Sequence, residues 1–226
     1  SLIDETDLFK CNKNLKNSVI YLGIPVSQKV KKLPIKELEK KNRDIFNIGI
    51  LSRIEEYKGH EDLLVAYASL PGETKEKFMI YFVGPCKQIY KNKLLRLLKN
   101  LSIVNNVIFT GYLPEESQEI ISNFDLLMCL TRDFEGFGIT LAEAMSVKVP
   151  ILATKVGAIP EFLNEKNSYL INPCSPSEIS KALENFILNN NFWKLRAENA
   201  YNDFYNFYNS DVMCKKLITH FGINIK

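Results

Sequence analysis

Two glutamates bracket a glycine-rich turn in the middle of the chain. Glu135 comes directly before Gly136-Phe137-Gly138, and seven residues separate it from Glu143, which lies in an Ala/Leu/Met-rich stretch that predicts a helix. Glycine lets a ligand approach the main chain, and the first N–H groups of a helix can donate to phosphate oxygens. Carboxylates repel phosphate but accept hydrogen bonds from hydroxyls. The pattern therefore indicates a ligand with phosphate in its middle and diols at both ends, as in a sugar nucleotide.

Two cations stand at a second turn, earlier in the chain. Arg53 and Lys58 follow an apolar run over residues 45–51 that predicts a buried strand. A guanidinium fork and a compact ammonium on one loop can hold a diphosphate between them. The alternative is an ordinary surface loop, in which Glu55 and Glu56 pair with the two cations.

These residues must be positioned by the elements around them, which alternate between strand and helix from residue 44 onward. We expect strands over 45–51, 78–83, 107–110, 124–130, 149–154 and 168–171, and helices over 60–70, 89–101, 114–123, 139–147, 177–188, 191–207 and 211–221. A further short strand is expected over 19–22. This alternation predicts an α/β fold with a Rossmann-like, doubly wound parallel sheet and flanking helices. Ligands of such sheets bind beyond the carboxyl ends of the strands.

The run EGFGITLAEAM over residues 135–145, with Arg53 and Lys58-Gly59 upstream, resembles the signature of family 4-type retaining glycosyltransferases of the GT-B fold, also called glycosyl transferases group 1. The resemblance covers about residues 44–190, one half of a GT-B fold. It implies that Glu135 is catalytic and contacts the donor sugar. It further implies a diphosphate site and a ribose and base site, formed respectively by Arg53, Lys58, Gly136, Phe137, Gly138 and Ile139, and by Glu143, Gly84 and Leu113.

The resemblance also implies an activity and a domain organisation. The whole enzyme would transfer a sugar from a UDP- or GDP-sugar to an acceptor hydroxyl, in surface polysaccharide or glycolipid synthesis, without a metal or other cofactor. Residues 1–43 would be the remnant of an N-terminal domain and a linker, 44–190 the nucleotide-sugar domain, and 191–226 helices packing toward that N-terminal domain. An acceptor sugar or lipid-linked sugar would bind through the N-terminal half.

Two positions depart from the family pattern, and one aromatic residue has a structural alternative. Lys148 stands where a glycine commonly ends the signature helix, which affects helix termination more than chemistry. Ala158 replaces the second of two frequent glycines and narrows the loop near the donor sugar. Phe137 is expected to anchor the turn by packing its ring into the core, offering only its N–H to a ligand.

Composition restricts the other classes of function. The 226 residues are 46% hydrophobic, enough for one sizeable core, and a net charge of +3 is too small to indicate nucleic acid. Five scattered cysteines indicate a reducing compartment, and two histidines argue against a metal site. With no transmembrane run or signal peptide, we expect a cytoplasmic protein; a peripheral contact at the inner face of the membrane is compatible with this.

Three alternatives remain at this stage. The chain could be a non-catalytic nucleotide-binding module, or another GT-B nucleotide-sugar enzyme such as an epimerase. A phosphorylase would need a lysine for pyridoxal phosphate, for which the sequence offers no convincing candidate. A nicotinamide-binding domain is disfavoured because no G-x-G-x-x-G motif follows the first strand.

Overall fold

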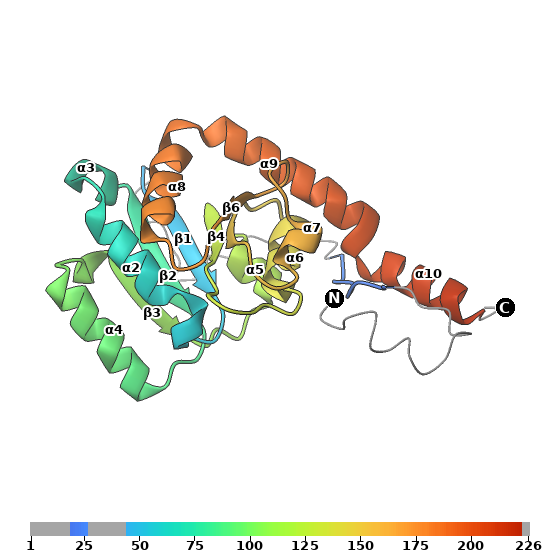
Figure 1. The fold of residues 1–226 in the computed structure, drawn as a ribbon, viewed down its shortest axis with the longest axis horizontal. Helices are drawn as coiled ribbons and strands as arrows, with labels where there is room; N and C mark the ends of the chain where they lie inside the picture. The colour runs from blue at the N-terminus through green and yellow to red at the C-terminus, as the bar shows by residue number, and fades with distance from the viewer. Residues whose placement is uncertain (1–18, 27–43, 223–226) are drawn as a thin grey trace.

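A computed structural model describes residues 19–26 and 44–222. The fold centres on one parallel sheet of six strands in the order β3-β2-β1-β4-β5-β6 (Figure 1). The strands are β1 (Phe46–Leu51), β2 (Phe78–Val83), β3 (Val107–Gly111), β4 (Leu126–Cys129), β5 (Ile151–Thr154) and β6 (Tyr169–Ile171). The predicted doubly wound α/β architecture is confirmed.

Helices cover both faces of this sheet because the strand side chains alternate between two apolar cores. In β1, β2, β4 and β5, even-numbered residues such as Ile48 and Ile80 pack with α2 (His60–Ser69), α4 (Gln88–Asn100) and α8 (Pro176–Leu188). The odd-numbered residues of these four strands, such as Tyr81 and Leu127, pack with α5 (Ser117–Ile121), α6 (Ile139–Ser146) and α7 (Ile159–Phe162). Strands buried on both faces read as continuous apolar runs, which is how the sequence revealed them.

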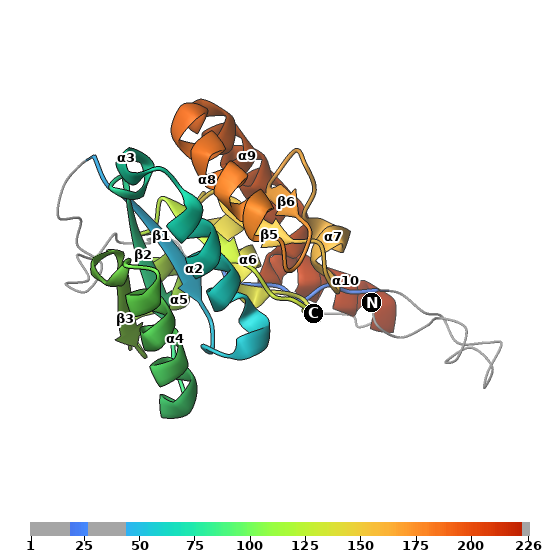
Figure 2. The same ribbon diagram turned by 60° about the vertical axis from the view of Figure 1, so that its left-hand side comes forward.

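Helix α9 (Asn190–Asp203) joins the two layers at the β6 side of the sheet (Figure 2). Trp193, near its start, belongs to the core of the first face, whereas Ala200 belongs to the core of the second. The predicted helix over 191–207 is divided, because α9 ends at Asp203. After α9 the chain forms a π-helical turn, η4 (Phe204–Tyr208), and the side chain of Asn209 then caps α10 (Ser210–Phe221).

Some other predicted boundaries differ from the structure. The helix expected over 114–123 shortens to α5, because the backbone of Glu116 is still extended. The strand expected over 19–22 does not form; an isolated bridge follows this segment, from Ile24 to Asn209. A short helix, α3 (Gly72–Lys75), occupies the Pro-Gly break after α2, and 3-10 turns η2 (Glu56–Lys58) and η3 (Val104–Asn106) precede α2 and β3.

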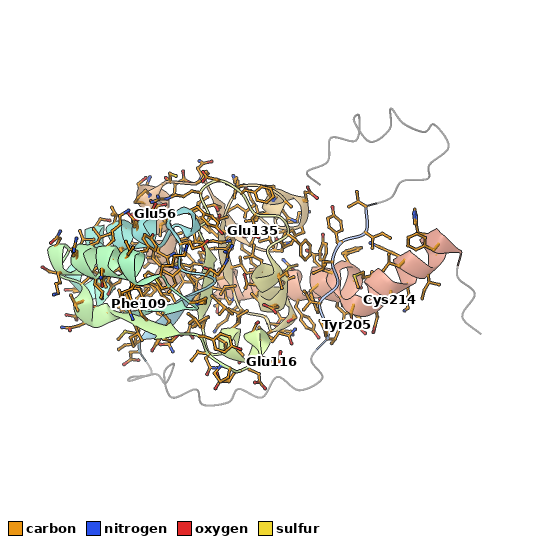
Figure 3. The ribbon with its side chains drawn as sticks, turned by 90° about the horizontal axis from the view of Figure 1, so that it is seen from below. Glu56, Phe109, Glu116, Glu135, Tyr205 and Cys214 are labelled. Carbon is orange, nitrogen blue, oxygen red and sulfur yellow. The ribbon has the colours of Figure 1, made fainter. Side chains whose placement is uncertain are left out.

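The C-terminal end of the described chain extends away from the sheet. Helix α10 points outward from the body in Figure 1, and Tyr205 and Cys214 lie along this C-terminal arm in Figure 3. Every residue of α10 is half-buried or exposed in the described structure. In the described part of the chain, no helix has both the length and the apolarity needed to cross a membrane.

The sheet order places a crevice where the predicted site residues lie. β1 pairs with β2 on one side and with β4 on the other, so the connections leave β1 and β4 in opposite directions. This is the topological switch point at which open α/β sheets bind ligands. The loop after β1 carries Arg53 and Lys58, and the loop after β4 carries Glu135.

Candidate nucleotide-sugar site

Lys58 and Glu135 form an ion pair between these two loops. Nζ of Lys58 lies 2.8 Å from Oε2 of Glu135, and the side chains are only 16% and 19% exposed. Figure 3 shows Glu135 in the loop between β4 and α6. Burial opposes the ammonium charge, but the hydrogen bond and charge of Glu135 outweigh burial and raise the pKa of Lys58. Lys58 thus places a cation beside Glu135, the residue predicted to be catalytic.

Gly59 explains why the lysine loop can approach so closely. Its φ is +75°, in the left-handed region that favours glycine. A Cβ at this position would overlap the carbonyl oxygen of Leu130, the residue after β4. A side chain here would therefore push the Lys58 loop away from the Glu135 loop.

Arg53 lies on the same loop but is not paired with Glu135. Its guanidinium donates to Glu55 at 3.1 Å and to the hydroxyl of Tyr57 at 3.0 Å, and its side chain is 66% exposed. The ammonium of Lys58 stands 5.1 Å from the centre of the Tyr57 ring. Tyr57 therefore lies between the two cations, and Arg53 is free to reorient at the cost of a weak exposed pair.

The glycine turn leads directly into α6. Gly138 has φ +75° and is the residue before the helix, and no described side chain caps the helix start. The N–H of Leu141 already donates to the carbonyl of Gly138, which leaves the N–H groups of Ile139 and Thr140 for an anionic ligand. The ring of Phe137 packs 5.1 Å from that of Phe162, which confirms its predicted anchoring role.

The loop after β5 fixes the backbone of Glu135. The N–H of Ala158 donates to the carbonyl of Glu135 at 2.9 Å. Gly157 has φ +53°, and a Cβ there would overlap backbone atoms of Glu135. The departure from the family pattern at Ala158 is accommodated, since its methyl group is buried and only its N–H faces the glutamate.

Glu143 lies farther along α6, partly buried. Oε2 of Glu143 is covered and has no hydrogen-bond partner among the described residues. Burial raises its pKa to about 7, with a further contribution from the charge of Glu116, while a hydrogen bond from Ser117 acts in the opposite direction. A buried acceptor without a donor is what a ligand hydroxyl could satisfy.

A cavity of about 360 Å³ opens beside Ser117 at the ends of β1, β2 and β3. Gly84 and Leu113, the two residues expected at the base, both line it, and Thr140 of α6 lies on its wall. Gly84 has φ +135°, and a Cβ would overlap the carbonyl oxygen of Ser52. Tyr112 is 77% exposed at the rim. The sequence places each of these residues at the end of its own strand. The structure shows that the ends of the three strands form one cavity.

Sequence reasoning missed three groups around this site. The sequence did not single out Tyr57 between the two cations, Ser117 beside Glu143, or the partly buried pair of Arg132 with Asp62. Their types carry no motif; the one available signal was Arg132, a cation three residues before Glu135. Within residues 19–26 and 44–222, no three His, Cys, Asp or Glu side chains gather as metal ligands would.

The fold and the site define a parallel α/β domain that presents a phosphate-binding turn, flanked by carboxylates, at its topological switch point. The model of the family described as glycosyl transferases group 1 matches residues 31–203. The chain belongs to this family, and its fold is that of the C-terminal half of a GT-B glycosyltransferase.

Known relatives and solved structures agree with this membership. The chain is 32% identical over 172 residues to N-acetyl-alpha-D-glucosaminyl L-malate synthase of Bacillus anthracis, covering 72% of this chain and 42% of that protein. The C-terminal domain of a group 1 protein (LpcC) from Francisella tularensis superposes with a TM-score of 0.69 at 25% identity, covering 84% of this chain and 97% of that chain. HepE from Anabaena, solved with UDP-glucose, superposes with a TM-score of 0.78 at 22% identity, covering 91% and 57%. The chain spans about half the length of the curated relatives it matches.

Proposed function

We propose that this chain is the donor-binding half of a glycosyltransferase that moves a sugar from a nucleoside-diphosphate sugar to an acceptor hydroxyl. The observation that carries this proposal is the Lys58–Glu135 pair, which lies beside the uncapped start of α6 at the switch point of the sheet. A cation and free helix N–H groups can stabilise a diphosphate leaving group, and the adjacent carboxylate can hold sugar hydroxyls.

In this assignment each site residue has one role. Glu135 contacts the donor sugar, and Arg53 and Lys58 bind the diphosphate with the main chain of residues 136–139. Glu143 accepts from the ribose, and the cavity lined by Gly84 and Leu113 receives the base. The buried, unpartnered oxygen of Glu143 supports its role, because a diol would supply the missing donors.

We favour UDP over GDP as the nucleotide, because HepE, similar in fold, was solved with UDP-glucose. The acceptor would bind to the part of the enzyme that accounts for the relatives' extra length. Retention of anomeric configuration, a role in surface polysaccharide or glycolipid synthesis, and a cytoplasmic location at the inner membrane face complete the proposal.

The proposal is tested by donor binding and by one substitution. In thermal-shift measurements, UDP-sugars should stabilise the protein more than ADP-sugars. A ligand at a hundred times its Kd adds ~2.7 kcal/mol to the free energy of unfolding. In the full-length enzyme, Glu135→Gln should retain UDP binding and lose transfer by about 100-fold or more. Normal transfer by this variant would remove Glu135 from the mechanism.

The same measurements separate the enzyme from a non-catalytic nucleotide-binding module. An enzyme should bind a UDP-sugar with an additional contribution from the sugar, and that contribution should disappear in Glu135→Gln. A module that recognises only the nucleotide would bind UDP and UDP-sugar equally, and the substitution would have no effect on either.

A further inference from the structure

Arg132 connects the loop that carries Glu135 to the helix that follows Lys58. Arg132 lies between β4 and the glycine turn, and Asp62 lies in the first turn of α2. Nε of Arg132 donates to Oδ2 of Asp62 and Nη2 donates to Oδ1, each at 2.8 Å. Two parallel bonds to one carboxylate fix both the distance and the orientation of the guanidinium plane.

Backbone contacts also connect the two loops, one on each side of Lys58. The N–H of Arg132 donates to the carbonyl of Tyr57 at 2.7 Å, immediately before Lys58. Gly59, immediately after Lys58, is packed against the carbonyl of Leu130. The lysine is thus held at its preceding and following residues by the chain segment that leads to Glu135.

The side-chain pair is shielded enough to hold this geometry. The Arg132 and Asp62 side chains are 28% and 11% exposed, against 46% and 53% for the ion pair of Lys148 with Glu198. Hydrogen bonding to Asp62 raises the pKa of Arg132, although burial acts against it. Because the guanidinium is already bonded to a carboxylate, it stabilises the loop arrangement without needing the ligand.

We propose that Arg132 and Asp62 are positioning residues that hold the Lys58 loop against the Glu135 loop in the geometry that donor binding needs. The inference rests on the proposed function for its consequence in catalysis, but its structural part concerns the unliganded protein alone. A displacement of about 1 Å in either loop would misalign the cation and the carboxylate, and such misplacement can cost roughly 100-fold in rate.

The structural part is tested by a double-mutant cycle on Lys58 and Glu135. The coupling between Lys58→Met and Glu135→Gln is measured by urea unfolding of the full-length protein, in the parent and in Asp62→Asn. The coupling should fall to half or less in Asp62→Asn. Arg132→Lys, which keeps the charge but loses the planar fork, serves if Asp62→Asn does not fold, and the same fall is expected there. The matched control, Glu198→Gln, should leave the coupling unchanged.

An unchanged coupling in the tested variant overturns the inference, as does an equal fall in the Glu198→Gln control. A wild-type protein that binds no nucleotide would contradict the proposed function while leaving this coupling result intact, so the two failures can be told apart.

The catalytic part is tested by separating kcat from KM in the full-length enzyme. Asp62→Asn should lower kcat/KM for the donor about 10- to 100-fold, mostly through kcat, with UDP affinity reduced less than tenfold. Arg132→Lys, which loses the two-bond contact with Asp62, should show a loss of the same kind. Unchanged kcat/KM would overturn the positioning role. Tighter UDP binding by Asp62→Asn would also overturn it, because it would show that the freed guanidinium binds phosphate directly.

Discussion

The ammonium of Lys58 lies 2.8 Å from the carboxylate of Glu135, although 77 positions separate them in the chain. In the unliganded protein each charge is therefore satisfied by the other. A bound diphosphate would compete with Glu135 for the lysine, and a donor sugar would compete with the lysine for Glu135. Binding of a complete nucleotide sugar can replace both halves of the pair at once, whereas free phosphate replaces only one.

Replacing Lys58 should weaken nucleotide binding. We expect Lys58→Met to raise the Kd for UDP about 10- to 100-fold, since a charge-assisted hydrogen bond contributes about 1.5–3 kcal/mol. Calorimetric titration of both proteins measures the difference. Lys148→Met is the matched control, because Lys148 also forms a 2.8 Å ion pair, with Glu198, but away from the glycine turn. Equal losses in both variants would contradict a specific role for Lys58.

Glu143 should make stability depend on pH. Its pKa is raised from 4.5 to about 7 in the folded protein, so the folded state binds more protons than the unfolded state between these values. Stability should therefore be lost as pH rises through about 7. Thermal unfolding without nucleotide compares the stability of Glu143→Gln with that of wild type. The difference in unfolding free energy, in favour of the variant, should grow by about 2 kcal/mol from pH 5 to pH 8, after allowance for partial solvent exposure. Parallel pH profiles would show that Glu143 titrates normally.

Gly157 should not tolerate a side chain. Gly157→Ala places a Cβ against the backbone of Glu135 at a positive φ, so we expect a loss of about 2 kcal/mol in stability and a lower transfer rate. Gly72→Ala provides the control, because nothing lies within 4 Å of a Cβ at that position. Its stability should change by less than about 0.5 kcal/mol in urea unfolding. A fully active, stable Gly157→Ala protein would be inconsistent with the close contact to Glu135.

Lys148 occupies a position that favours glycine. It has φ +59° at the C-terminal end of α6, and its side chain pairs with Glu198 and lies 4.6 Å from the ring centre of Tyr201. We expect Lys148→Gly to raise stability by about 0.5–1 kcal/mol, since the relief of a left-handed backbone exceeds the contribution of an exposed ion pair. Thermal unfolding measures this. A loss of stability would mean that the contacts with Glu198 and Tyr201 outweigh the backbone cost.

Much of the fold could be predicted from local patterns. The apolar runs over 78–83 and 149–154 needed no knowledge of their neighbours, because a strand buried on both faces is apolar throughout. The helix predicted over 191–207 is α-helical only to Asp203, and its last residues form the π-helical turn that begins at Phe204, whose ring lies in the second core. The strand over 19–22 was wrong, since its apolar residues find no neighbouring strand among the described residues.

The features of the site likewise fall into those that the sequence predicts and those that only the structure shows. Sequence alone determined which residue types carry chemistry, because Glu135, the glycine turn and Glu143 are fixed in spacing by one loop and one helix. Only the tertiary structure decided that Lys58 faces Glu135 and that Arg132 bonds to Asp62. Both contacts cross between β1 and β4, which are neighbours through the pairing of Ile48 with Leu126. Strand order is set by packing across the whole sheet, and a local pattern of residues does not contain it.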